Sequence, residues 1–163
     1  MFQSQPTLRA PLTPLFRLTA LLGPRVTQQA RIEALRPVNQ ARFFDALTAV
    51  GITHLTVVFT GTGPAARIDS IAPWMGPVAV DLPEARLRYA ALTWDAPEVE
   101  WRDLTLAEGA DQIALDLLGD PDIHGVCSGG AVGEFCFDAA ARSICIEINE
   151  VSTAAAYDNS PGR

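Results

Sequence analysis

Two alternating stretches around a short alanine-rich loop, in residues 133–150, constrain the fold more than any other feature of the chain. Phe135 and Phe137 alternate with polar residues before the loop, and every second residue from Ile144 to Ile148 is an isoleucine after it. Successive side chains of a β-strand point to opposite faces, so a period of two predicts a hairpin with one apolar face and one polar face.

The same pattern fixes the register of the hairpin. The apolar side chains of both strands must point into one core, and a slip of one residue would turn one strand's apolar side chains to solvent. With a loop of four residues, the expected cross-strand pairs are Asp138–Ser143, Phe137–Ile144, Cys136–Cys145, Phe135–Ile146 and Glu134–Glu147. Two cysteines and two glutamates then lie on the face away from the core.

The chain has three cysteines, Cys127, Cys136 and Cys145, and no export signal. Directly opposed cysteines could form a disulfide, but structural disulfides are rare in that setting, so we expect Cys136 and Cys145 to be neighbouring free thiols. His124 and Cys127 are also capable of binding metal, but a structural zinc site needs four ligands and the other histidine, His54, lies elsewhere. A Cys127–His124 nucleophilic pair would lack an orienting third group.

The facing glutamates, Glu134 and Glu147, are the candidate functional pair. Two opposed carboxylates repel each other, so one of them takes up a proton, a metal ion lies between them, or an arginine bridges them. A functional site would use them as general acid and base or as ligands of a hard cation, with Asn149 or His54 as helpers.

A solvated sheet face without a site is the alternative for these carboxylates. Structural ion-pair networks are more common than functional sites, so we favour this interpretation. An arginine such as Arg67, Arg86 or Arg88 would then bridge the two glutamates.

Upstream of the hairpin, the spacing of apolar residues changes from helical to strand-like at Gly51, which occupies the position of a C′ glycine. One helical pattern runs from Thr27 to Leu35, and another follows Pro37 with Asn39 as its N-cap. They form either two helices or one helix kinked at the proline. Strands are expected at residues 52–60, 67–72, 78–82 and 86–94.

A capping box at Thr105 and Glu108 begins a further helix, because the threonine oxygen accepts from the N3 amide while the glutamate accepts from the N-cap amide. This helix is expected to end at Gly119. Residues 95–103 and 122–130 are expected to be loops.

The elements together predict a single α+β domain, residues 15–153, with a mainly antiparallel sheet of four to six strands and helices packed on one face. A length of 163 residues suits one hydrophobic core. Residues 1–14 and 154–163 lack periodicity, and we expect them to be flexible tails.

Charge and hydropathy exclude several classes of partner. The net charge of −7 disfavours direct binding of nucleic acid, because the protein would repel the phosphates. No apolar run approaches the roughly 20 residues that span a bilayer, and we identify no signal peptide. We therefore expect a soluble, cytoplasmic protein without a membrane partner, a nucleic-acid partner or a cofactor.

Several short motifs, in their order along the chain, resemble an uncharacterised family of small proteobacterial proteins. This family is a domain of unknown function that is often carried by plasmids and integrated elements. The motifs are Val38-Asn39, Phe44-Asp45-Ala46-Leu47, Gly51-Ile52-Thr53, Gly133-Glu134-Phe135, Phe137-Asp138, Arg142, Ile144 and Asn149-Glu150. The resemblance covers about residues 30–150.

Departures from the family pattern bear on function. Relatives carry acidic and polar residues in two loops that here, at residues 60–66 and 125–130, contain no carboxylate. The resemblance also implies threonine at the positions of Cys136 and Cys145, which favours a structural role for the thiols. A site built from those loops in relatives is therefore expected to be lost in this chain.

We accordingly expect a non-enzymatic protein-binding module, such as an accessory or anti-defence (anti-CRISPR-like) factor of a mobile element. The alternative is a small hydrolase or metal-dependent enzyme that uses the paired carboxylates Glu134 and Glu147. A protein partner is expected in the first case, and self-association is left open.

Overall fold

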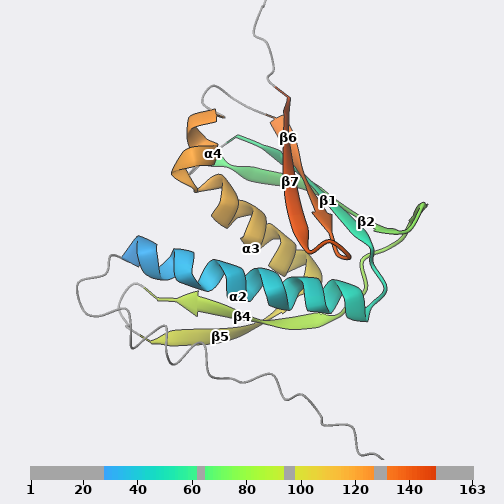
Figure 1. Ribbon diagram of the computed structural model, residues 1–163, viewed down its shortest axis with the longest axis horizontal. Coiled ribbons are helices and arrows are strands. Elements are labelled where there is room, and N and C mark those ends of the chain that lie inside the picture. Colours follow the sequence, from blue (N-terminus) through green and yellow to red (C-terminus); the bar gives the residue numbers. More distant parts are fainter. Residues whose placement is uncertain (1–27, 62–64, 94–97, 127–131, 150–163) are drawn as a thin grey trace, which may run out of the picture.

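The computed structural model describes residues 28–61, 65–93, 98–126 and 132–149 (Figure 1). The predicted tails and both predicted domain limits lie outside these ranges. The elements in chain order are α2 (Gln28–Ala49), β1 (His54–Thr60), β2 (Arg67–Met75), β3 (Val78–Ala79), β4 (Arg86–Leu92), β5 (Val99–Thr105), α3 (Leu106–Leu118), α4 (Pro121–Val126), β6 (Val132–Asp138) and β7 (Ser143–Asn149).

The strands form two antiparallel sheets. Five strands build a sheet with the order β3-β2-β1-β6-β7, and β4 pairs separately with β5. The helices α2 and α3 lie between the two sheets, so each sheet is covered by helices on one face (Figure 1). The predicted α+β class is confirmed. The expectation that residues 86–94 join the main sheet is wrong, because alternation identifies a strand but not its neighbour.

Three local boundaries also differ from the sequence prediction. β5 begins inside a predicted loop, because pairing with β4 supports a strand whose charged residues are exposed to solvent. α4 begins inside the second predicted loop, and the Asp120 carboxylate accepts a hydrogen bond of 3.0 Å from the Asp122 amide at its first turn. β3 comprises only two of the five residues predicted for it.

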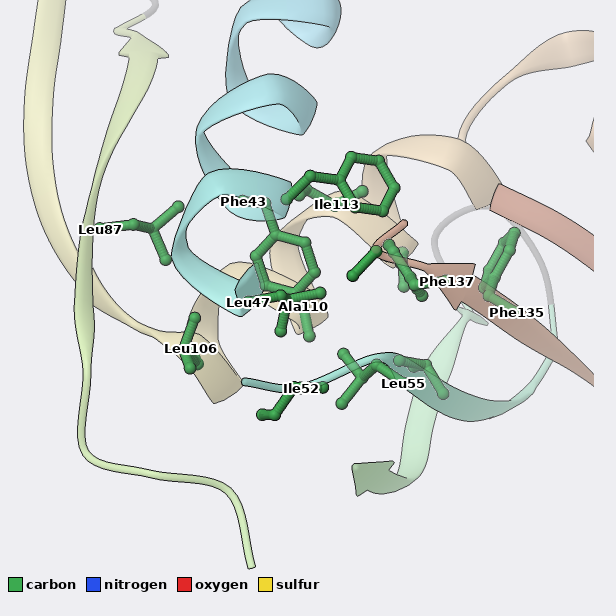
Figure 2. Close-up of a cluster of buried hydrophobic side chains, with 14 of the residues drawn as sticks. Phe43, Leu47, Ile52, Leu55, Leu87, Leu106, Ala110, Ile113, Phe135 and Phe137 are labelled. Atoms are coloured by element: carbon green, nitrogen blue, oxygen red, sulfur yellow. The ribbon is translucent and has the colours of Figure 1, made fainter. Parts of the chain in front are cut away.

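The core lies between the main sheet and the helices. Phe43 and Leu47 of α2 are fully buried, as are Phe135 and Phe137 of β6. The rings of Phe43 and Phe137 meet edge to face with centroids 5.5 Å apart, a favourable aromatic geometry. Figure 2 shows side chains from α2, α3, β1, β4 and β6 meeting in this core.

The C-terminal hairpin has the predicted register. All five expected cross-strand pairs are present, from Asp138–Ser143 to Glu134–Glu147, and the isoleucines of β7 point to the core side. Gly133 is needed where β6 crosses the core, because a Cβ atom there would lie 2.6 Å from both the Glu147 carbonyl oxygen and the Phe59 ring.

Helix α2 is one helix, and it continues through Pro37. A proline inside a helix costs about 3 kcal/mol, which burial of the following turns offsets here. Asn39 is therefore inside the helix and the prediction that it caps one is wrong. Gly51 adopts a φ of +79° after the last turn, as predicted for a C′ glycine.

Helix α3 begins with the predicted capping box. The Thr105 hydroxyl accepts from the Glu108 amide at 3.2 Å, and the Glu108 carboxylate accepts from the Thr105 amide at 2.8 Å. The buried side of this helix approaches its neighbours closely, because a Cβ atom on Gly109 would lie 2.8 Å from Leu87. α3 therefore packs tightly against β4.

Candidate functional site

The residues predicted for a site lie on the outward side of the main sheet. On β1, β6 and β7, every second residue points into the core and the others point away from the helices. We call these outward-pointing residues the acidic face; they are His54, Thr56, Val58, Thr60, Val132, Glu134, Cys136, Asp138, Ser143, Cys145, Glu147 and Asn149. Three carboxylates and one histidine are its only ionisable groups apart from the thiols.

Glu134 and Glu147 are direct cross-strand neighbours, and Val58 of β1 lies on the other side of Glu134. Among the described residues, no salt bridge reaches either glutamate. Arg67 instead contacts Asp69 at 2.8 Å.

The predicted arginine bridge is therefore wrong. Arg86 and Arg88 belong to β4, which lies in the other sheet, and Arg88 lies over the Trp101 ring at 5.5 Å. The assignment failed because it placed β4 beside the hairpin.

Cys136 and Cys145 face each other as free thiols, as predicted. The Cys136 sulfur lies 3.8 Å from a Glu134 carboxylate oxygen. Burial, followed by the charges of Glu134 and Glu147, raises the pKa of the Cys136 thiol. A thiol that stays protonated is a poor nucleophile, so the acidic face does not activate Cys136.

His54 and Asn149 lie at different distances from the glutamate pair. His54 is opposite Asp138, with its Nε2 atom 3.6 Å from the Asp138 carboxylate. Glu134 pairs with Val58, which is four residues along β1 from His54, so His54 lies about 13 Å along the strand from the glutamate pair. Asn149 is two residues from Glu147 on the same face and remains within reach.

The acidic face offers few ligands to a metal ion. In the described parts of the chain, no cluster of three or more histidine, cysteine, aspartate or glutamate side chains is arranged to bind one. The side chain of His124 and all of Cys127 lie outside those parts. Glu134, Glu147 and Asn149 thus remain a set of two carboxylates and an amide on a sheet.

A second candidate site is a pocket of about 210 Å³ between α2, α3 and the β4–β5 sheet. Two of its polar side chains meet at Asp116, whose carboxylate oxygens accept from the Tyr89 hydroxyl at 2.5 Å and from the Gln112 amide at 3.0 Å. The remaining lining residues are Ile32, Leu35, Arg36, Asn39, Ala90, Ala91, Leu92, Arg102 and Leu104.

Both arginines that line this pocket are already engaged, and Arg102 donates to the Glu100 carboxylate at 3.2 Å. Arg36 donates to Asp120 at 2.8 Å and to the Asp116 carbonyl oxygen at 3.4 Å. Burial, with the Asp116 charge as the next cause, raises the pKa of Tyr89, so the tyrosine acts as a hydrogen-bond donor and not as a base. The pocket therefore holds a polar network in which only the buried Arg36 Nε atom finds no partner among the described residues.

Sequence reasoning did not identify this pocket. Alternation along β4 places Tyr89 on the buried side, and a buried tyrosine hydroxyl needs a partner. The sequence therefore indicates that the Tyr89 hydroxyl has a partner, but this partner, Asp116, is 27 residues away on α3. Only the packing of α3 against β4 brings Asp116 to the tyrosine.

Comparison with protein families gives a match over most of the chain. The model of a family of unknown function, DUF6878, matches residues 35–159, a range that contains every motif of the resemblance. No curated protein and no solved structure matches the chain. None of the described helices is both long and apolar enough to cross a bilayer.

Proposed function

The chain belongs to DUF6878, a family of unknown function, and we propose that it is a protein-binding module whose acidic face binds a basic surface of a partner protein. One observation carries the proposal. Glu134 and Glu147 lie side by side on an outward sheet face, and no arginine among the described residues pairs with either.

The energetics of that pair favour a cationic partner. Directly opposed like charges destabilise a sheet by a few tenths of a kcal/mol, and an inserted guanidinium would remove this repulsion. A guanidinium also makes charge-assisted hydrogen bonds to two carboxylates at once. The partner we propose therefore presents an arginine or lysine between Glu134 and Glu147.

The shape of the acidic face favours a protein over a small molecule. Small ligands bind in concave sites that enclose most of their surface, whereas this face is the outer side of a sheet. Val58, Thr56 and the two thiols lie beside the carboxylates and provide less polar area for contact. The overall charge of −7 would also accelerate encounters with a basic partner.

We place that partner in a host complex. The family that the chain resembles is expected to be carried often by plasmids and integrated elements, so its partner would be a component of the host cell. Host complexes that bind nucleic acid have basic surfaces that contact phosphates. An accessory or anti-defence role follows if the acidic face occupies such a surface.

The experiment is quantitative capture from host lysate with three baits of equal folding stability. The first is the wild-type protein, the second is Glu134→Gln/Glu147→Gln, and the matched control is Glu100→Gln/Asp103→Asn, which removes two charges at exposed positions of β5. We expect a salt-sensitive partner that the wild type and the control retain and that the first double variant loses. Equal capture by all three baits would exclude the acidic face as the binding surface.

A metal-dependent enzyme is the second candidate, because two opposed carboxylates with Asn149 nearby supply oxygen ligands for a hard cation. Calorimetric titration with Mg²⁺, Mn²⁺ and Zn²⁺ tests it. This candidate predicts heat of binding and a higher Tm for the wild type, and neither for Glu134→Gln/Glu147→Gln. Absence of both effects in the wild type would eliminate it.

A further inference from the structure

The open edges of the two sheets are protected to different degrees. Strand edges carry unpaired backbone groups, and proteins shield them by short strands, charged residues, prolines or covering elements. β3 has two residues and follows Pro77. The outer edge of β4 is covered by α2, where the Asn39 side chain bonds both the N–H and the C=O of Ala90.

The remaining edges are β5 and β7, and they differ in charge. Glu100, Arg102 and Asp103 give β5 three charged residues out of seven. β7 is equally long but has one, Glu147, with no proline and no lysine. In the described part of the chain, β7 has a strand neighbour only in β6, so it is the least protected edge (Figure 1).

The backbone groups at this free edge can be identified by alternation. The Ala139 amide, at the end of β6, donates to the Thr53 carbonyl oxygen beside β1. Odd-numbered residues of β6 therefore point their amides to β1 and even-numbered residues point theirs to β7. Because Cys136 pairs with Cys145, the odd-numbered residues of β7 bond β6. The N–H and C=O groups of Ile144, Ile146 and Ile148 point outward and pair with no other described strand.

We propose that β7 pairs antiparallel with β7 of a second copy of this chain, about a two-fold axis at Ile146. This register pairs Ile146 with itself, Ile144 with Ile148, Cys145 with Glu147 and Ser143 with Asn149. It aligns all seven residues and uses the free backbone groups of all three isoleucines. The two five-stranded sheets then form one continuous ten-stranded sheet across the axis.

Side-chain chemistry selects this register and this occupant. The isoleucines of both copies lie on the core side only if even-numbered residues of one β7 pair with even-numbered residues of the other. Each of these isoleucines is half-buried in the single chain. A two-fold axis at Glu147 would place the Glu147 side chains of the two copies opposite each other. An axis at Cys145 would leave residues 148 and 149 of each copy without a partner. In the proposed register, no like charges face each other, so the strand is complementary to itself.

The first test is the oligomeric state in sedimentation equilibrium at concentrations up to about 100 μM, a range that detects micromolar association. We expect a dimer for the wild type. Cys145→Glu places glutamates opposite Glu147 twice in the dimer and should weaken it roughly tenfold or more. Cys145→Lys at the same exposed position should retain or strengthen it. A monomeric wild type, or equal dimerisation of both variants, would overturn the proposal.

The second test measures the register by crosslinking, with Cys127→Ser and Cys136→Ser as background so that Cys145 is the remaining native thiol. Adding Glu147→Cys places a thiol opposite Cys145 of the second copy, at a Cα separation within the disulfide range. Oxidised glutathione should take two electrons and two protons from the thiol pair and yield a covalent dimer. The control, Ser143→Cys, has the same spacing from Cys145 but faces Asn149, and should not crosslink. A dimer that crosslinks equally in both variants, or in neither, would contradict the register.

Self-association through β7 is independent of partner binding by the acidic face. A monomeric wild type that still captures a partner would exclude only the β7 pairing. If the wild type is a dimer but the Glu134→Gln/Glu147→Gln variant captures the same proteins as the wild type, only the proposed function is excluded.

Discussion

Two parts of helix α2, residues 28–40, which we call its N-terminal half, and residues 41–49, which we call its C-terminal half, meet the rest of the protein by different means. The C-terminal half buries Phe43, Phe44 and Leu47 in the core, and the first two contact the Phe137 ring. The N-terminal half borders the 210 Å³ pocket, where Asn39 and Arg36 connect the helix to β4 and α3 by hydrogen bonds. One half is held by apolar burial and the other largely by polar contacts.

This difference shows how one helix can serve two sheets. Apolar burial contributes more stabilisation but tolerates adjustment, since any side chain of similar volume preserves most of it. A buried hydrogen bond contributes less, yet loss of one partner leaves the other unsatisfied, so its geometry is stricter. We therefore expect the C-terminal half to fix stability and the N-terminal half to fix the position of β4.

The largest effect should come from Phe43→Ala. Phe43 is 0% exposed, and removal of a fully buried aromatic ring leaves a cavity that costs about 3–5 kcal/mol. Urea denaturation followed by circular dichroism measures this loss in the free energy of unfolding. The control is Leu115→Ala on α3, a half-exposed site where about 1 kcal/mol or less is expected. Equal losses at the two positions would contradict the view that burial of Phe43 in the core fixes the stability contributed by the C-terminal half of α2.

The next largest effect should come from Asn39→Ala in the N-terminal half. Asn39 is buried and donates to the Ala90 carbonyl oxygen at 2.9 Å while accepting from the Ala90 amide at 2.8 Å. The substitution leaves both backbone groups unsatisfied, and we expect a loss of about 2–4 kcal/mol.

Gln40→Ala on the adjacent helix position is the matched control for Asn39→Ala and should change stability by no more than about 0.5 kcal/mol. Hydrogen exchange then locates the effect. Amides of β4 and β5 should exchange faster in Asn39→Ala than in the wild type, while those of β6 keep their protection. Uniform acceleration across both sheets would show that Asn39 does not hold β4 specifically.

The same division explains what the sequence predicts well. The C-terminal hairpin follows from apolar alternation, because burial of Phe135 and Ile146 on one side allows a single register. The capping box at Thr105 is equally local, since both hydrogen bonds join residues three apart. Features that depend on neighbouring residues, or on one apolar face, could be predicted.

Features that depend on distant polar pairs could not be predicted. Asn39 has the residue type of an N-cap, but its partner is 51 residues away on β4. The strand β5 was missed because charged residues make it resemble a loop, and the bridging arginine was misassigned because strand order does not follow from alternation. Of the candidate site, the Glu134–Glu147 pair could be placed and the pocket around Asp116 could not.

A smaller effect is expected for Tyr89→Phe, which removes the hydrogen bond to Asp116 and should cost about 1–2 kcal/mol at neutral pH. The pKa of Tyr89 is raised in the folded protein above its ordinary value of 10.0. Above pH 10 the unfolded tyrosine ionises and the folded one does not, so wild-type stability falls as the pH rises. Tyr89→Phe should lack this part of the alkaline decline. If the unfolding free energies of the wild type and Tyr89→Phe decline in parallel between pH 9 and pH 11, the Tyr89 hydroxyl is not held protonated in the folded protein.

The smallest effect concerns the contact between Arg36 and Asp120. The hydrogen bond from Arg36, followed by that from the Asp122 amide, lowers the pKa of Asp120. A lowered carboxyl pKa contributes stability that is present above the unfolded value and is lost as the pH falls through the folded value. Both side chains are about one-fifth exposed, so solvent screening keeps this contribution below about 1 kcal/mol.

Asp120→Asn isolates that contribution, with Asp69→Asn as the control because Asp69 forms an ion pair of the same 2.8 Å length with an arginine on the exposed β2. Thermal unfolding between pH 2 and pH 7 should show a slightly lower Tm for Asp120→Asn at pH 7 and convergence with the wild type at the acid end. Hydrogen exchange at pH 7 should place the change in the first turns of α2 and the end of α3. If the two variants change exchange in the same elements, the Arg36 contact does not hold the N-terminal half, and Asn39 alone determines where β4 lies.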